Sequence, residues 1–598
     1  MKKIKLIHIW LILLLISATV RVLEAKPGDQ FEIKSVQFKG NKAFSGDQLR
    51  GIMISRPSSL FKKRYYHAEV LQNDLDNIAL FYKQQGYLES KITDYKVRKD
   101  TTEKEVEITI DIHEGIRIYV ESVSLSGNEF FSGKTLGKLI TLREGDPLLQ
   151  KKMDESTQKI LNYYSNNGFL DAQVQTDVKV LADSQMAFVN FVIREGPQYR
   201  IEDIQLNGLT ITEPHVVTRE LTFKKEEVVD YSKLLNSQRR LYLTGLFQSV
   251  FISLKPAPGE DSTLKVVLID LKDKIPAQFN VSGGYGSVEK FRVKTELYND
   301  NISGSARKAG LALKYSSLYL GAEASFTEPW TFHTRFRTDV NLKADYAKEP
   351  GFDLRSIGGV ITVGRGFLKR SNVLLSYRHE NNDLSNIKVA EIKEPPQNKV
   401  RSFKLALIYD TRDNIFNSTS GTYLEWSNEL AGLFFTGGVR FFNTILDAKY
   451  FYPATRSTVV AMSLSLGWIN APGGINAIPL NERFYTGGPN EMRAFRYQKV
   501  GPLDQNGIPL GGKFKLVWNV FEIRQTIYKM FGMAVFGELG NIYITPSEIK
   551  LNNLRQSVGT GLRVNSPVGL LRLDYAFNLK PKPGEPKTRL YFSVGQAF

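Results

Sequence analysis

The second half of the chain, residues 276–598, alternates apolar with polar or small residues at a period of two. In one clear segment, Leu571, Leu573 and Tyr575 occupy one face, while Arg572 and Asp574 occupy the other. This period is typical of half-buried β-strands. Glycine- and asparagine-rich turn signals divide the region into sixteen such segments, the even number usual in single-chain bacterial barrels. The pattern therefore predicts a sixteen-stranded antiparallel transmembrane β-barrel over residues 276–598.

The overall composition does not contradict a barrel. Mean hydropathy is −0.24 and 24% of the residues are charged, which would also suit a soluble protein. A membrane helix needs about 20 consecutive apolar residues, and we find no such run. Alternating strands average to an unremarkable hydropathy. A soluble β-sandwich is the competing interpretation, but it predicts about seven strands per domain and does not explain why the chain ends in a strand closing on Phe598.

The first 25 residues have the order of a secretory signal. Lys2, Lys3 and Lys5 precede the apolar stretch 6–18, and small residues lead to Ala25. A basic region, an apolar region and a small-residue cleavage point define a signal peptide. A retained N-terminal anchor helix is the alternative. We predict a signal peptide at 1–25, so that the mature chain begins outside the cytoplasm.

Residues 26–275 contain one pattern three times. Each copy opens with a short alternating strand ending in glycine, continues with helical sequence, and closes with two further strands. Glycine suits the left-handed position at a helix end. The shared features are the strand-ending glycines Gly40, Gly127 and Gly208, the helix-ending Gly86, Gly168 and Gly245, and, in two copies, the dipeptides Glu114-Gly115 and Glu195-Gly196. We predict three β-α-α-β-β units, at 26–116, 117–197 and 198–275.

Two uses of such a unit stay open from the sequence. A sheet with an exposed edge can bind an extended peptide as an added strand, which suits a docking module. A rigid spacer is the equally acceptable alternative.

Composition also removes several kinds of chemistry. The chain has no cysteine, which excludes disulfides and thiolate sites, and its six histidines are scattered singly. We therefore predict no metal site, no cofactor and no catalytic residues. The formal net charge is +17, but the 79 Lys and Arg form no dense tract. Contact with anionic lipid or solvent is favoured over nucleic acid.

Three repeats before a sixteen-stranded barrel resemble a known superfamily, the outer-membrane assembly factors with POTRA domains typified by BamA and TamA. The repeat count resembles TamA most. Short segments match in order: Phe326–Trp330, Tyr409–Asn414 and the strand-poor stretch 471–511. The resemblance implies that 471–511 is an extracellular loop folded back into the barrel lumen.

That loop carries the signature implied by the family. Met492, Arg493, Ala494 and Phe495 align with its aliphatic residue, arginine, glycine and aromatic residue, with alanine replacing glycine. If the glycine served a positive φ, alanine would be strained there. An arginine in a lumen needs carboxylate partners, because a buried unpaired charge is costly. The resemblance implies Glu522 and Glu538 as those partners.

The resemblance further implies an outer-membrane protein assembly factor that is not an enzyme, placed in the outer membrane of a diderm bacterium with its repeats in the periplasm. Its partners would be unfolded barrel clients, accessory proteins docking on the repeats, and outer-membrane lipid. Clients would enter between the first and last strands. Glycine weakens strands, so the predicted seam residues are Gly283, Gly284, Gly286, Gly595 and Phe598; crowding on the lumen side is the other interpretation of those glycines. A two-partner-secretion pore is the alternative function.

Overall fold

A computed structural model describes residues 30–59, 63–181, 185–368, 370–389, 396–415, 417–433, 436–566 and 569–594. The predicted signal peptide and the seam residues Gly595 and Phe598 lie outside this part of the chain. Packing divides the chain into two compact units. One contains the first two repeats together with 221–238 and 252–269, and the other contains the barrel with 206–220 and 239–251.

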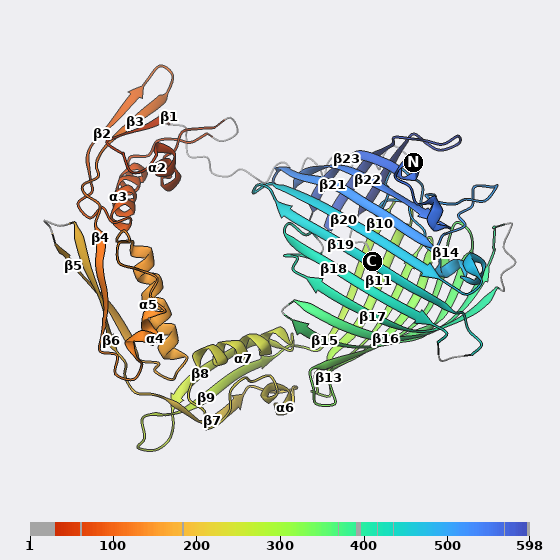
Figure 1. Cartoon of the computed structure of the whole chain (residues 1–598), viewed down its shortest axis with the longest axis horizontal. Helices are drawn as coiled ribbons and strands as arrows, with labels where there is room; N and C mark the ends of the chain where they lie inside the picture. The colour runs from red at the N-terminus through yellow and green to blue at the C-terminus, as the bar shows by residue number, and fades with distance from the viewer. Residues whose placement is uncertain are drawn as a thin grey trace, which may run out of the picture. The chain divides into compact units, whose positions relative to one another are not determined.

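The three predicted repeats are present, each with the order β-α-α-β-β (Figure 1). In every copy the last strand lies in the middle of a three-stranded sheet, with order β1-β3-β2, β4-β6-β5 and β7-β9-β8. The elements are β1 (Glu32–Lys39), α2 (Gly46–Ile52), α3 (Ala68–Gln84), β2 (Lys91–Asp100) and β3 (Glu105–His113); β4 (Tyr119–Ser126), α4 (Gly133–Gly137), α5 (Gln150–Ser165), β5 (Gln173–Leu181) and β6 (Met186–Arg194); β7 (Arg200–Asn207), α6 (Pro214–Thr218), α7 (Tyr231–Leu243), β8 (Phe247–Pro256) and β9 (Leu264–Asp273).

The repeated strand-ending glycine has a steric cause. Gly40, Gly127 and Gly208 have φ of 80°, 76° and 79°. A Cβ at any of them would overlap a backbone carbonyl oxygen of the central strand, that of Ile112 in the first repeat and that of Ile193 in the second. Only glycine tolerates both the left-handed backbone and this close approach.

We expect Gly127→Ala to lower the free energy of unfolding of the second repeat by about 2 kcal/mol or more, since the alanine would combine a positive φ with a steric overlap. Hydrogen exchange of the full chain should then show protection in β4 and β6 reduced by about tenfold or more. Gly137→Ala is the matched control, because a Cβ added to Gly137 in α4 would have nothing within 4 Å. Equal protection in the two variants would contradict the steric explanation.

The repeated Glu-Gly dipeptide also has a structural role. Glu114 Oε1 accepts hydrogen bonds from the Tyr82 hydroxyl (2.9 Å) and from the Ala43 N–H (2.8 Å). Glu195 Oε1 does the same for the Tyr164 hydroxyl (2.7 Å) and the Phe130 N–H (3.0 Å). Burial is the main cause that raises the pKa of the Tyr82 hydroxyl, and the hydrogen bond to Glu114 raises this pKa further. Each glutamate therefore joins the long helix of its repeat to the turn after the first strand.

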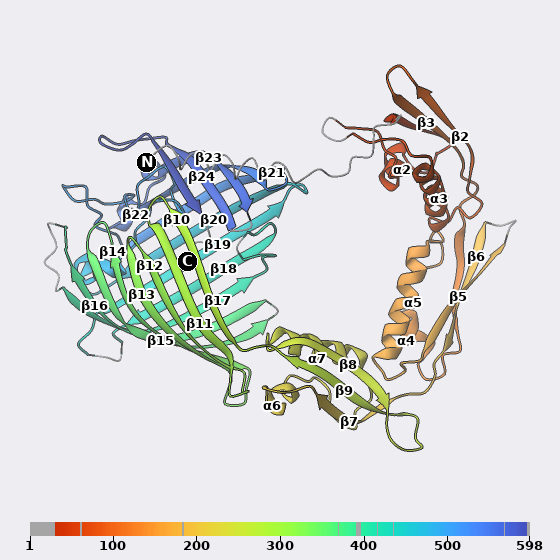
Figure 2. The ribbon, with the colours of Figure 1, turned by 180° about the vertical axis from the view of Figure 1, so that it is seen from behind.

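Residues 277–594 form the predicted barrel, a closed sheet of sixteen strands in sequence order (Figures 1 and 2). No helix within the described ranges is long and apolar enough to cross a membrane. The strands are β10 (Ala277–Gly286), β11 (Lys290–Ile302), β12 (Arg307–Ser316), β13 (Tyr319–Thr331), β14 (Phe336–Lys348), β15 (Asp353–Leu368), β16 (Ser371–Ser385), β17 (Gln397–Asp410), β18 (Gly421–Ala431), β19 (Phe441–Pro453), β20 (Thr458–Asn470), β21 (Phe514–Tyr528), β22 (Phe531–Tyr543), β23 (Arg555–Ser566), β24 (Gly569–Asn578) and β25 (Thr588–Val594).

The alternation seen in the sequence separates two faces of the wall. Leu311 and Leu313 of β12 are 60% and 63% exposed on the outer face. On the lumen side, β12 and β13 carry paired charges such as Lys314 and Glu323, 2.8 Å apart. Since β10 follows the third repeat directly, the strand ends near Ala277 lie on the repeat side, and the ends near Gly286 lie on the opposite side.

Between β20 and β21 a long loop, residues 471–513, contains only two short 3-10 helices, η1 (Gly474–Ala477) and η2 (Leu480–Glu482). Two more, η3 (Pro546–Glu548) and η4 (Leu551–Asn553), lie between β22 and β23.

Candidate functional site: the lumenal loop and the barrel seam

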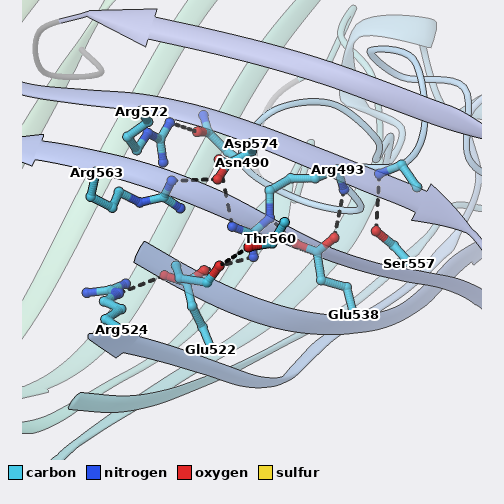
Figure 3. Close-up of polar contacts among 12 residues, drawn as sticks. Asn490, Arg493, Glu522, Arg524, Glu538, Ser557, Thr560, Arg563, Arg572 and Asp574 are labelled. Carbon is cyan, nitrogen blue, oxygen red and sulfur yellow. Dashed lines mark hydrogen bonds and ion pairs between the residues drawn. The ribbon is translucent and has the colours of Figure 1, made fainter. Parts of the chain in front are cut away.

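The loop arginine lies within a set of carboxylates from three strands. Arg493 is only 4% exposed. Its Nη2 lies 2.8 Å from Glu522 Oε2 of β21, and its Nε lies 2.7 Å from Glu538 Oε1 of β22. A third carboxylate, Asp574 of β24, has Oδ2 3.9 Å from Nη1. Figure 3 shows these side chains converging on the guanidinium, so the loop is bound to the inner face of the wall.

Glu538 holds the loop backbone as well as its side chain. Its Oε2 accepts the Arg493 N–H at 2.7 Å, and the neighbouring Ala494 N–H donates to Ser557 Oγ at 3.1 Å. The guanidinium also lies 3.3 Å from the centre of the Phe536 ring. Charge-assisted hydrogen bonds are stronger than neutral ones, and several of them together also fix geometry. These bonds therefore hold the loop in one position on the wall, in addition to neutralising the charge of Arg493.

The carboxylates are shared with other arginines of the wall. Arg524 Nε lies 2.7 Å from Glu522, and Arg563 Nη1 lies 2.6 Å from Asp574. Arg572 Nη2 donates to Asn490 Oδ1 of the loop at 3.1 Å (Figure 3). The site is therefore a network, in which removal of one charge changes the partners of several others.

The position predicted to be strained is not the strained one. Ala494 is fully buried, and Met492 has the positive φ, 55°. Met492, Ala494 and Phe495 pack into an apolar cluster with wall residues including Phe536 and Ala576. Alanine in place of the family glycine therefore contributes a buried methyl group at a position that does not require a left-handed backbone.

A second anchor of the same loop was not predicted from the sequence. Arg378 of β16 lies 3.0 Å from Glu482 Oε2 in η2, and 2.8 Å from Glu429 Oε1 of β18. Glu380 and Lys343 extend this cluster, since Lys343 Nζ lies 2.9 Å from Glu380 Oε1. A single arginine in an alternating strand is an ordinary lumen-facing residue, so only the folded loop identifies its partner. Together the two anchors attach the loop to β16–β18 and to β21–β24, which places it across the lumen.

We expect Arg378→Ala to release the η2 part of the loop, since it leaves buried carboxylates without their cation; breaking such pairs typically costs about 3 to 5 kcal/mol. Trypsin cleavage within 471–513 of the full chain should become faster by about tenfold or more. The double variant Arg378→Ala with Glu482→Gln should recover part of the protection against trypsin. If the effects of the two substitutions simply added, the coupling between Arg378 and Glu482 would be contradicted. Lys404→Ala is the control, because Lys404 pairs within the wall, with Glu425 at 3.8 Å.

The described part of the contact between the first and last strands, which ends at Val594, is short. Among the described residues, β10 and β25 share two register pairs, Tyr285 with Val594 and Gly286 with Ser593. The neighbouring pair β24 and β25 shares seven. Ser287 adds further hydrogen bonds to Phe592: its N–H donates to the Phe592 carbonyl at 2.8 Å, and its Oγ accepts the Phe592 N–H at 2.7 Å. The register therefore leaves most of β10, from Ala277 to Gly284, without a partner in the described part of β25.

The three predicted seam glycines of β10 differ in their surroundings. A Cβ on Gly284 would lie 2.6 Å from the Val594 oxygen and 2.9 Å from Arg292 Nε. For Gly283 and Gly286 the nearest atoms are 3.7 Å and 4.0 Å away. Among the described atoms, crowding therefore accounts for Gly284 but not for Gly283 or Gly286. The space beside Gly284 is used by Arg292 of β11, whose Nη2 donates to the Val594 carbonyl at 3.3 Å.

The loop motif contacts the last strand directly. The Tyr591 hydroxyl of β25 donates to the Phe495 carbonyl at 2.6 Å, in a buried position. Tyr591 was not singled out in the sequence, although its place in an alternating strand puts it on the lumen face. The seam and the loop are therefore joined by this hydrogen bond.

The two other matching segments lie at the repeat-side ends of strands. Trp330 Nε1 donates to Glu220 Oε1 at 2.9 Å, both within the second compact unit. Asp413 accepts N–H groups from Asn414, Thr419 and Ser420, and so organises the turn between β17 and β18.

Comparison with known proteins agrees with this architecture. The model of the Omp85 superfamily domain matches residues 301–598, and that of the surface antigen variable number repeat, or POTRA, matches 31–115, 118–196 and 199–273. The chain belongs to the Omp85 superfamily. As a member with this barrel and these repeats, it resides in the outer membrane with its POTRA repeats in the periplasm.

Curated relatives span nearly the whole chain. The outer membrane protein assembly factor BamA of Neorickettsia risticii is 26% identical over 98% of this chain and 80% of that protein. BamA of Nitratidesulfovibrio vulgaris is 25% identical over 97% of this chain and 75% of that protein. The crystal structure of BamA from Haemophilus ducreyi lacking POTRA domains 1-3 superposes with a TM-score of 0.66 at 17% identity, covering 81% of this chain and all of that one. These relatives do not support the narrower likeness to TamA, which stays a prediction.

Proposed function

We propose that this Omp85 protein assembles β-barrel proteins into the outer membrane, receiving unfolded clients on its POTRA repeats and inserting them through the seam between β10 and β25. The observation that supports the proposal is that, among the described residues, which end at Val594, β10 and β25 share two register pairs. Unpaired backbone groups cannot face lipid without a partner. The edge of β10 is therefore a template that a client strand can complete.

The route through the wall is favoured over a route through the lumen. Arg493 and Glu482 attach the loop 471–513 to separate parts of the inner wall. A folded loop anchored in this way obstructs passage along the barrel axis. No covalent or enzymatic step is required, because strand pairing itself supplies the free energy of assembly.

Reception of clients would use the sheet edges of the repeats. In each repeat both outer strands pair with the central strand on one side only, and β2, β5 and β8 are one set of these edges. Exposed edges accept an extended segment as an additional strand. The same edges offer docking positions for periplasmic or inner-membrane accessory proteins, so both kinds of partner would compete for them.

Reconstitution tests the proposal. The full chain in liposomes should accelerate the folding of a urea-denatured outer-membrane barrel, measured by its heat-resistant migration in electrophoresis, by about tenfold over empty liposomes. Absence of acceleration, together with export of a soluble passenger, would favour the two-partner-secretion alternative.

A further inference from the structure

An apolar groove lies on the outer face of the wall formed by β12 to β16, strands that lie side by side (Figure 2). Its volume is about 790 Å³. Small residues, Ala322, Ala324, Ala344 and Gly359, form its floor, and larger ones such as Leu311 and Ile361 border it. In the register of the sheet, these residues lie opposite residues of the exposed outer face. The groove therefore opens away from the lumen.

The groove ends in a basic surface on the side away from the repeats. His379 lines the groove itself and pairs with Arg401 on β17. Lys399 lies two residues before Arg401, nearer the end of β17 that faces away from the repeats. Arg355 and Lys348 occupy outer positions of β15 and β14. Two acids lie on the same face, Asp383 opposite Arg355 and the largely buried Asp353 opposite Lys348. Arg401 Nη1 also donates to the Thr436 carbonyl of the loop between β18 and β19 at 3.1 Å.

Two strands elsewhere in the wall lack this combination. The outer positions of β19 from Phe442 to Tyr452, and of β20 from Val460 to Asn470, carry no charged side chain. Aromatic residues such as Trp468 occupy the corresponding height. The basic surface therefore does not continue over β19 and β20.

We propose that this surface binds a phosphorylated glycolipid of the outer leaflet, with acyl chains in the groove and phosphate groups against the basic residues. The repeats are periplasmic, so the basic end of the groove lies at the cell-surface leaflet. Arginine and lysine recognise phosphate through charge-assisted hydrogen bonds, and clustered basic residues beside a membrane favour anionic headgroups. The small floor residues leave room for chains that a Leu- or Phe-lined wall would exclude. This inference rests on the membrane location and is independent of the proposed assembly function.

Native mass spectrometry of the purified full chain in detergent tests the inference. The probes are hexa-acylated diphosphoryl lipid A, phosphatidylglycerol and phosphatidylethanolamine. We expect retention of one lipid A, with at least fivefold weaker retention of both phospholipids. His379→Ala with Arg401→Ala should weaken lipid A binding by fivefold or more. Lys399→Ala with Arg355→Ala, at exposed positions, gives a second charge variant should the first pair fail to fold.

Two matched controls separate the site from its surroundings. Arg365→Ala removes an outer-face cation at the repeat-side end of β15 and should leave binding unchanged. Ala324→Phe fills the groove and should abolish binding, whereas Ala448→Phe, at an outer position of β19, should not. Binding of lipid A that survives both charge variants, or equal retention of phosphatidylglycerol with the same dependence on these variants, would overturn the proposal.

Discussion

A disulfide across the seam is expected to stop client insertion. The pair is Gly286→Cys with Ser593→Cys, in a chain whose natural sequence has no cysteine. The Ser287 N–H bonds the Phe592 carbonyl, so residues 286 and 593 form the adjacent non-hydrogen-bonded pair. Cα atoms in such pairs are about 4.5 Å apart, within the range that a disulfide spans. A Cβ on Gly286 would have no atom closer than 4.0 Å, so the cysteine fits.

In proteoliposomes, the oxidised variant should fold clients at the rate of empty liposomes, and reduction should restore at least most of the activity. The matched control is Phe577→Cys with Thr588→Cys, which joins β24 to β25 within the continuous sheet. Since the Asn578 N–H bonds the Lys587 carbonyl, this is also a non-hydrogen-bonded pair. Unchanged insertion with a quantitatively oxidised seam would show that the proposed lateral route is wrong.

Charge reversal at the loop arginine is the second large effect. Arg493→Glu places a fourth carboxylate among Glu522, Glu538 and Asp574. Removing one partner of a buried pair typically costs about 3 to 5 kcal/mol, and reversal adds repulsion. The loop should leave its site, so that trypsin cleaves within 471–513 and client folding slows by about tenfold or more. The Tyr591 contact to Phe495 should be lost at the same time.

The geometry predicts which second change rescues this variant. Glu538→Arg should restore part of the protection, because the loop's Arg493 is the arginine paired with Glu538 among the described residues. The rescue stays partial because the residue 493 N–H loses its acceptor. Glu522→Arg should not rescue, since it would place a guanidinium beside Arg524. Lys404→Glu, at a partly exposed pair with Glu425 within the wall, is the matched control and should have a small effect. Equal rescue by both reversals would contradict this network.

Local patterns carried much of the architecture. The period of two predicts the strands, and the recurring glycine predicts the repeats, because both express short-range requirements: one face toward lipid, and a turn where Cβ would meet a carbonyl oxygen. Glu522 and Glu538 were found only through the family resemblance. The third carboxylate, Asp574, is visible in the sequence as a lone acid in an alternating strand, but nothing local distinguishes it from other lumen-facing residues.

The sequence by itself determined the number of repeats, the number of strands and the face on which each strand residue lies. Closure of the barrel decided the rest. It pairs Tyr285 with Val594 at the described end of β25, brings Arg378 to Glu482, and assembles Ala324, Gly359 and His379 into one groove. The alternating pattern does not distinguish the residues that make these contacts from others on the same face of a strand. Which residues meet depends on the strand register and on a loop that crosses the lumen. Period and composition describe one strand at a time, whereas these sites exist only between strands.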